Sequence, residues 1–176
     1  MPSTYLLAPH ERIAVLIGPK GKTKKKIEHI TGTKITIDSE SGEVTIEGKN
    51  AVQEMLAEKI CRAIARGFAP EKAFLLAKEY YELRIIDLKD VIGKSPRAIH
   101  TKKARVIGTS GSVRKRIEDS CNCYISVYGD TVALIGLEED LDYAESIVMD
   151  ILAGGEIEAA FRRLEERKLS KGSFEF

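Results

Sequence analysis

Hydrophobic and polar positions in the first half of the chain follow two different spacings. Some short segments alternate between apolar and polar residues, which is typical of strands with one buried face. Longer segments repeat apolar residues every three or four positions, which indicates amphipathic helices. We therefore predict a strand at 4–7, helices at 9–17 and 22–31, paired strands at 34–38 and 43–48, and a long helix at 50–67.

The helical spacing also assigns the residues that should point into the core. On the first two helices these are Ile13, Leu16, Ile17, Ile27 and Ile30. On the long helix, whose first turn Asn50 can cap, the expected apolar face consists of Val52, Met55, Leu56, Ile60, Ala63 and Ile64.

The second half of the chain repeats this order of elements. The same spacings predict a strand at 82–87, a helical stretch ending at Ile107, a helix at 112–121, strands at 123–128 and 131–136, and a helix from about 138 to 152. We expect the inward face of that last helix to hold Leu141, Ala144, Val148, Ile151 and Leu152.

Two further helices lie outside the repeat. A short helix at 70–79 joins the two halves. After Gly154-Gly155 the spacing predicts an amphipathic helix carrying Ile157, Phe161 and Leu164, followed by a loose tail beyond Leu169.

One short motif accompanies the repeated elements. Residues 16–22 read Leu-Ile-Gly-Pro-Lys-Gly-Lys, and residues 106–112, at an offset of 90, read Val-Ile-Gly-Thr-Ser-Gly-Ser. A single Gly-x-x-Gly carries little information, because short motifs arise by chance. Here the surroundings repeat too, since Ile27-Glu28 matches Ile117-Glu118 at the same offset. The chain is therefore a duplicated module.

Composition agrees with two small globular units. The chain has 176 residues, of which 43% are hydrophobic and 31% charged, so each half can bury a modest core. No apolar run is long enough to span a bilayer, and the first residues lack the pattern of a signal peptide. We expect a cytoplasmic monomer that does not bind membranes.

Catalytic and metal-binding motifs are missing from the sequence. Cys61, Cys121 and Cys123 form no disulfide framework, and no further ligands follow the Cys-x-Cys pair at zinc-finger spacing. Gly93-Lys94-Ser95 lacks the preceding glycine of a P-loop. No hydrolase or metalloprotease signature occurs. We predict a protein that is not an enzyme and uses neither metal nor cofactor.

Positive charge is concentrated at the repeated motif. The net charge is only +1, but residues 12–27 and 100–117 each contain six Lys or Arg and no acid. The two runs together carry +12, which leaves −11 for the rest of the chain. A single run of this kind is usually a solvated helix face. Two runs around two equivalent glycine turns favour a surface that binds an anionic partner.

The order of elements in each half resembles that of the type I KH domain: strand, helix, turn, helix, strand, strand, helix, with Gly-x-x-Gly between the first two helices. The resemblance covers residues 3–66 and 80–152. The resemblance implies an α+β fold of two KH modules, each with β-α-α-β-β-α order and a three-stranded antiparallel sheet covered by helices. We expect the first module at 1–67, a helical linker at 68–79, the second module at 80–153, and a C-terminal helix and tail at 154–176.

The resemblance to KH domains also implies a role for the turns. In that family the Gly-x-x-Gly loop clamps the backbone of about four single-stranded nucleotides. Glycines let the backbone approach a phosphate closely, and the N-terminus of the following helix attracts anions. The first turn adds Lys20 and Lys22, whereas Thr109 and Ser110 in the second offer hydroxyl groups without charge. Charge there would come from Lys102, Lys103, Arg105, Arg114 and Lys115.

We predict that RNA contacts both turns and the basic residues around them. In the first module the predicted contacts are Ile17, Gly18, Pro19, Lys20, Gly21, Lys22 and Lys25. In the second they are Lys102, Arg105, Ile107, Gly108, Thr109, Ser110, Gly111, Ser112, Arg114 and Lys115. Tyr124 and Tyr128 have two interpretations, base stacking or packing in a sheet surface or between modules.

A narrower resemblance rests on four stretches of sequence. Residues 12–23, 84–88, 124–133 and 161–165 resemble the archaeal ribosomal-RNA-processing proteins of the Dim or partner-of-Nob group, which are related to the Krr factors; the most specific stretch is Tyr-Ile-Ser-Val-Tyr-Gly at 124–129. The resemblance implies binding near the 3′ end of small-subunit ribosomal RNA precursors. It also implies an endonuclease or another ribosome-assembly protein as partner.

Two other functions remain compatible with the residues themselves. The chain could be mainly a protein scaffold, with the acidic remainder and the C-terminal helix as docking surfaces and RNA as a minor ligand. It could also be a general KH binder of messenger RNA or single-stranded DNA. A steep salt dependence of binding favours nucleic acid over the scaffold.

Overall fold

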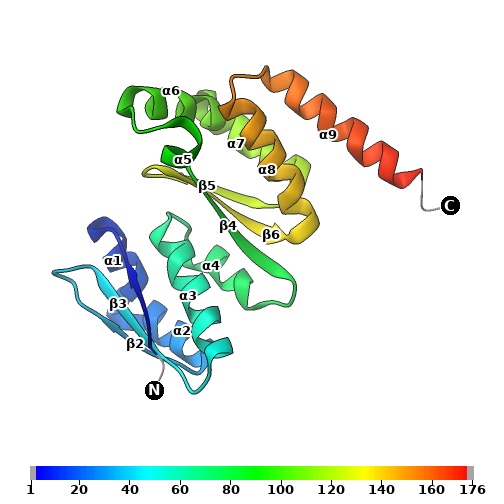
Figure 1. Cartoon of the computed structure of the whole chain (residues 1–176). Helices are drawn as coiled ribbons and strands as arrows, with labels where there is room; N and C mark the ends of the chain where they lie inside the picture. The colour runs from blue at the N-terminus through cyan, green and yellow to red at the C-terminus, as the bar shows by residue number, and fades with distance from the viewer. Residues whose placement is uncertain (1–2, 174–176) are drawn as a thin grey trace. The chain divides into compact units, whose positions relative to one another are not determined.

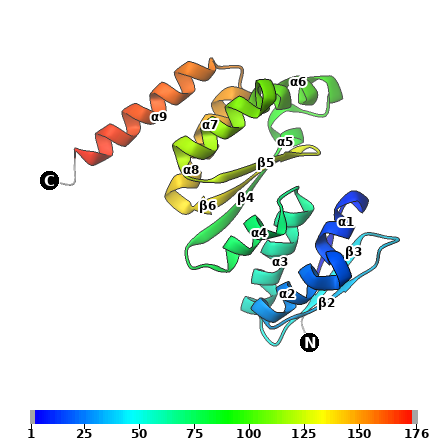
Figure 2. The same cartoon turned by 180° about the vertical axis from the view of Figure 1, so that it is seen from behind.

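The chain folds into two compact units, one containing residues up to Leu83 and the other beginning at Arg84. The structure is a computed structural model that describes residues 3–173. In each unit, helices cover one face of a three-stranded sheet (Figure 1 and Figure 2). The division falls within strand β4 (Tyr81–Asp87).

The first unit has the element order expected from the sequence. It contains β1 (Ser3–Leu7), α1 (His10–Ile17), a 3-10 turn at Pro19–Gly21, α2 (Lys22–Thr31), β2 (Lys34–Ile37), β3 (Glu43–Glu47) and α3 (Ala51–Ala65). The antiparallel sheet has the order β1-β3-β2, so β2 is an edge strand. The joining segment forms α4 (Pro70–Ala73) and a 3-10 helix at Phe74–Ala77, both within this unit.

The second unit repeats this arrangement with one addition. After β4 come α5 (Leu88–Ile92), α6 (Pro96–Ile107), a 3-10 turn at Thr109–Gly111, α7 (Ser112–Cys121), β5 (Tyr124–Tyr128), β6 (Thr131–Leu137), α8 (Glu138–Leu152) and α9 (Ile157–Gly172). The sheet order β4-β6-β5 is equivalent to that of the first unit. The helical stretch predicted before Ile107 is thus two helices, because Gly93 at φ 100° ends α5 and Ser95 caps α6.

The repeated Ile-Glu pair fastens α2 and α7 to their edge strands. Ile27 and Ile117 are fully buried. The next residue in each copy is a glutamate whose Oε1 accepts a hydrogen bond from a strand N–H, at 2.8 Å from Ile35 and at 3.0 Å from Ile125. Each carboxylate therefore satisfies a backbone donor that an edge strand would otherwise leave without a protein partner.

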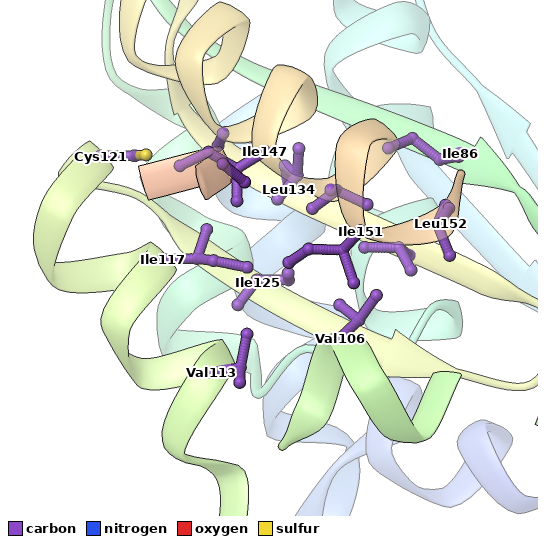
Figure 3. Packing of buried hydrophobic residues seen from close by; sticks show 14 of the residues in the cluster. Ile86, Val106, Val113, Ile117, Cys121, Ile125, Leu134, Ile147, Ile151 and Leu152 are labelled. Atoms are coloured by element: carbon purple, nitrogen blue, oxygen red, sulfur yellow. The ribbon is translucent and has the colours of Figure 1, made fainter. Parts of the chain in front are cut away.

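Apolar side chains fill the space between helices and sheet in the second unit. Figure 3 shows Val106, Ile117, Ile125, Leu134 and Ile151 from five different elements pointing toward one another. The predicted inward face of α8 is confirmed, since all five of its residues are buried. Helix α9 adds Phe161 and Leu164 to this core, as its amphipathic spacing predicts.

Part of the predicted apolar face of α3 was assigned wrongly. Val52 and Met55 are 76% and 59% exposed, and Ile30 on α2 is 37% exposed. The buried position near the start of α3 belongs instead to Glu54, whose carboxylate accepts the Gly48 N–H at 2.9 Å. The buried carboxylate is tolerated because it accepts a hydrogen bond from a backbone donor, which the spacing of apolar residues does not predict.

The predicted loose tail after Leu169 is wrong as far as Gly172, where α9 ends, and its last residues, 174–176, lie outside the described part of the chain. An ion pair and a hydrogen bond hold the last turns of α9 against the rest of the second unit. Lys171 pairs with Glu139 at 2.8 Å, and Lys168 donates a hydrogen bond to the carbonyl oxygen of Ser120. Such contacts join residues far apart in sequence, so local composition gives no sign of them.

Burial determines the chemistry of the three cysteines. All three are free and buried. Burial raises the pKa of Cys61 to about 12, of Cys121 to about 11, and of Cys123 to about 12. Because thiolates are the reactive form, these side chains behave as small apolar core residues.

We predict an alkaline loss of stability that depends on these thiols. The pKa of Cys61 in the folded chain lies above its ordinary value of 9.0, so its neutral form stabilises the folded state fully below that pH. The contribution disappears as the pH rises from there toward about 12. Urea unfolding at several pH values should show a smaller alkaline decline for Cys61→Ala than for the natural chain. Equal declines would show that the thiol does not titrate differently on unfolding.

Candidate nucleic-acid interface

The two glycine turns have the same backbone conformation. The first glycine has φ/ψ of 74°/172° in Gly18–Gly21 and 73°/175° in Gly108–Gly111. The third residue, at 55°/28° and 54°/30°, is left-handed in both copies although it is not glycine. The last glycine donates to the carbonyl oxygen of the first at 3.1 Å and 3.2 Å. Side chains differ between the turns, but the main-chain atoms presented to a ligand do not.

The first glycine of each turn is required by both conformation and space. Its φ/ψ lies in a region that essentially only glycine occupies. A Cβ on Gly18 would lie 2.8 Å from the backbone nitrogen of Thr23, and one on Gly108 would lie 2.7 Å from that of Val113. The turn is thus folded tightly against the first turn of the following helix.

The last glycine of each turn has a different environment. Gly21 and Gly111 have left-handed φ values of 73° and 76°, which favour glycine, but their surroundings are open. A Cβ on Gly111 would meet no atom within 4 Å, and one on Gly21 only the end of the Lys25 side chain at 4.0 Å. A ligand can therefore approach the backbone here closely.

Each turn leads directly into the N-terminus of a ten-residue helix. Neither α2 nor α7 has a side-chain cap or an acidic residue in its first turn. The first N–H groups of such a helix have no partner within the helix and favour a negative charge. Together with the open backbone of the turn, this arrangement suits a phosphate group.

The predicted contact residues fall into two classes of exposure. Ile17 and Ile107 are half-buried beside the turns, between core and surface. The exposed members are Pro19, Lys20, Lys22 and Lys25 in the first unit and Thr109, Ser110, Ser112, Arg114 and Lys115 in the second. Lys102 is half-buried on α6. Within residues 3–173 no ion pair or hydrogen bond engages any of the lysines in this set or Arg114.

Arg105 has a structural role that sequence reasoning missed. Its guanidinium donates to the carbonyl oxygens of Ile151 at 2.7 Å and Gly155 at 2.6 Å, at the end of α8. In the first unit Arg12 makes the equivalent pair of bonds near the end of α3, both at 2.8 Å. Arg12 thus attaches α1 to the end of α3, and Arg105 attaches α6 to the end of α8. The predicted RNA contact of Arg105 would have to be made in addition to these bonds.

Two more cations of the basic runs are used inside their own unit. Arg116 forms two hydrogen bonds with Glu158, at 2.7 Å and 3.1 Å, which lower the pKa of that carboxyl group. The same guanidinium lies over the Phe161 ring at 4.0 Å and so helps to dock α9. Lys26 lies 4.3 Å from the Phe74 ring centre. Only part of each basic run therefore remains for a ligand.

Metal-ligand clusters and membrane-spanning helices are both absent from residues 3–173. No group of three or more His, Cys, Asp or Glu side chains that could hold a metal ion occurs there. Within the same residues, no helix has the length and apolar content that crossing a membrane requires.

Tyr124 is 39% exposed on edge strand β5, and its stacking on a base stays a prediction.

Comparison with known families agrees with this geometry. The KH domain profile matches residues 3–61, and the profile of the eukaryotic type KH domain, KH-domain type I, matches residues 82–169. Each match covers one of the two glycine turns. The predicted α+β fold of two type I KH modules is therefore confirmed.

Individual relatives are similar over nearly the whole chain. A KH domain-containing protein of Methanocaldococcus jannaschii is 39% identical over 97% of this chain and 77% of its own length. Dim2p of Pyrococcus horikoshii has a TM-score of 0.87 and 41% identity, covering 94% of this chain and 99% of that one. The chain belongs to the family of tandem type I KH proteins that includes archaeal Dim2p.

A second crystal structure from Pyrococcus horikoshii contains a/eIF2alpha, aDim2p and rRNA. The matching chain has a TM-score of 0.89 and 42% identity, with 96% of this chain and 95% of that one covered. A protein of unknown function from Aeropyrum pernix matches with a TM-score of 0.90 and 35% identity, over 98% and 94% of the two chains. Both extend the similarity across both modules.

We predict that the two glycines of a turn differ sharply in their tolerance of a side chain. Gly111→Ala should cost about 1–2 kcal/mol of unfolding free energy, from its left-handed φ alone. Gly108→Ala should cost about 3 kcal/mol or more, because backbone strain is added to a collision with the Val113 amide. Denaturant unfolding of both variants measures the difference. Equal costs would contradict the close packing of the first glycine.

Proposed function

We propose that this protein binds single-stranded RNA in ribosome biogenesis, holding the 3′ region of small-subunit ribosomal RNA precursors while a nuclease processes them. One observation carries the proposal. Two turns of identical backbone each open onto an uncapped helix N-terminus with unpaired cations beside it. The crystallised complex of a similar aDim2p with rRNA supports the choice of RNA.

The two modules would hold the RNA backbone by different means. In the first, the exposed ammonium group of Lys20 stands at the tip of the turn and can neutralise a phosphate. In the second, Ser110 occupies the same backbone position and offers a hydroxyl group, while charge comes from Arg114 and Lys115 on α7. Backbone N–H groups act alike in both.

The protein's part in processing would be to position RNA. The predicted RNA contacts are glycines, isoleucines, hydroxyl groups and cations, a set suited to binding phosphate and base rather than to cleaving a bond. A nuclease would supply the cleavage. The scaffold alternative loses one of its surfaces, because the apolar face of α9 is buried in its own unit through Phe161 and Leu164.

We predict that a carboxylate at the open glycine of each turn abolishes RNA binding without unfolding. Gly21→Asp with Gly111→Asp places negative charge where phosphate would lie, and the site has room for the side chain. We expect at least a tenfold loss of affinity, measured by fluorescence anisotropy, for an oligonucleotide with the 3′ sequence of small-subunit rRNA.

Gly32→Asp is the matched control, because Gly32 at the end of α2 is left-handed like Gly21, with φ/ψ of 70°/25°, and an added Cβ there would meet only the flexible side chain of Gln53. It should keep full affinity. Unchanged binding by a folded Gly21→Asp, Gly111→Asp variant would refute the phosphate clamp. Equal affinity of the natural chain for an unrelated oligonucleotide of the same length would refute the ribosomal assignment in favour of a general KH binder.

We also predict that Ser110→Lys strengthens RNA binding. The backbone already suits lysine, since Lys20 has φ/ψ of 55°/28° where Ser110 has 54°/30°. One added phosphate contact should steepen the slope of log K against log salt concentration by about 0.7 for a single strand. Lys20→Ser should make the slope shallower by a similar amount. Slopes that do not respond to either change would show that these side chains lie away from the RNA.

A further inference from the structure

Two exposed histidines occupy equivalent places in the two modules. His10 begins α1 and His100 lies within α6, at the same offset of 90 residues that relates the glycine turns. Within residues 3–173 no hydrogen bond, ion pair or ring contact engages either imidazole. Both rings are therefore available to a ligand.

Each histidine shares a helix face with its glycine turn. The sequences His10-x-x-x-Ala14-x-x-x-Gly18 and His100-x-x-x-Ala104-x-x-x-Gly108 place three residues at intervals of four, which lie on one side of a helix. Both alanines are exposed, although alanine is often a core residue. Eight residues of helix place the imidazole about 12 Å from the turn. The small alanine side chain between them does not obstruct a strand lying along the helix, and this helix face, from His10 to Gly18 and from His100 to Gly108, is called the track below.

Several other identities between the two copies have structural explanations. The glycines are needed for the turn, Ile27 and its counterpart fill the core, and Glu28 and its counterpart bind a strand N–H. The histidines serve no such purpose within their modules. An exposed side chain retained in both copies without an internal partner indicates contact with a ligand.

We propose that His10 and His100 each stack on a base of the RNA strand, at the end of the track remote from the glycine turn. The inference rests on the proposed RNA binding and adds a base contact to its phosphate contacts. Histidine is among the side chains on which unstacked RNA bases stack. The alanines let the strand lie close to the helix between the two contacts.

A metal site is the main alternative for exposed histidines, and the described residues do not favour it. The two imidazoles belong to separate units, and no group of three or more potential ligands surrounds either one within residues 3–173. A phosphate contact by a charged imidazole is the other alternative. It differs from stacking in the substitutions that would preserve it, so experiment can separate the two.

The test compares substitutions at both positions in the full chain. His10→Ala and His100→Ala should each weaken binding of a single-stranded oligonucleotide of small-subunit rRNA 3′ sequence about fivefold. His→Phe at the same positions should keep most of the affinity, because the stacking face remains. His→Lys should not restore it. Alanine at exposed helix positions leaves folding intact, which circular dichroism verifies.

His29→Ala is the matched control, because His29 is exposed on α2 away from this track and should bind as the natural chain does. Affinity unchanged in His10→Ala and His100→Ala, while the natural chain binds RNA, would overturn the proposal. So would rescue by lysine but not phenylalanine, which would indicate a phosphate contact. Failure of the natural chain to bind RNA would instead refute the proposed function itself.

Discussion

The contact between the first glycine of each turn and the next helix determines the rest of the interface. Gly18 and Gly108 have a backbone conformation open essentially only to glycine, and each lies against the backbone nitrogen of the residue five positions later. This close approach aims the turn and the helix N-terminus at the same volume. In the proposed binding mode, this volume would hold one phosphate.

The positively charged side chains of these modules fall into two groups: some bind other parts of their own module, and others remain in solvent. Composition alone does not separate the two groups. Arg12 and Arg105 bind carbonyl oxygens at the ends of α3 and α8, while Arg116 docks α9 through Glu158 and Phe161. The planar guanidinium suits such multiple bonds, whereas lysines remain mostly solvated. The arginines thus build the site, and lysines such as Lys20 supply most of the charge that a ligand would meet.

Because the module is duplicated, its two copies can be compared with each other within one chain. The backbone of the turn is the same within a few degrees in both copies, although the residues inside it are Pro-Lys in one and Thr-Ser in the other. Main-chain contacts with RNA can therefore be common to both modules while side-chain contacts differ. The buried isoleucine and the strand-binding glutamate of α2 and α7 are the same in both copies because the fold requires them.

Periodicity and turn chemistry are local properties, so the order of elements, the duplication, the glycine turns and most of the core could be predicted from the sequence alone. The tertiary structure shows in addition which polar groups bind inside the protein: Glu54 is buried on α3 where it accepts a backbone N–H, and Arg105 binds backbone carbonyls. It also decided that α9 continues past Leu169. The bonds of Arg105 and of the last turns of α9 join residues far apart in sequence, whose relative positions no local pattern contains.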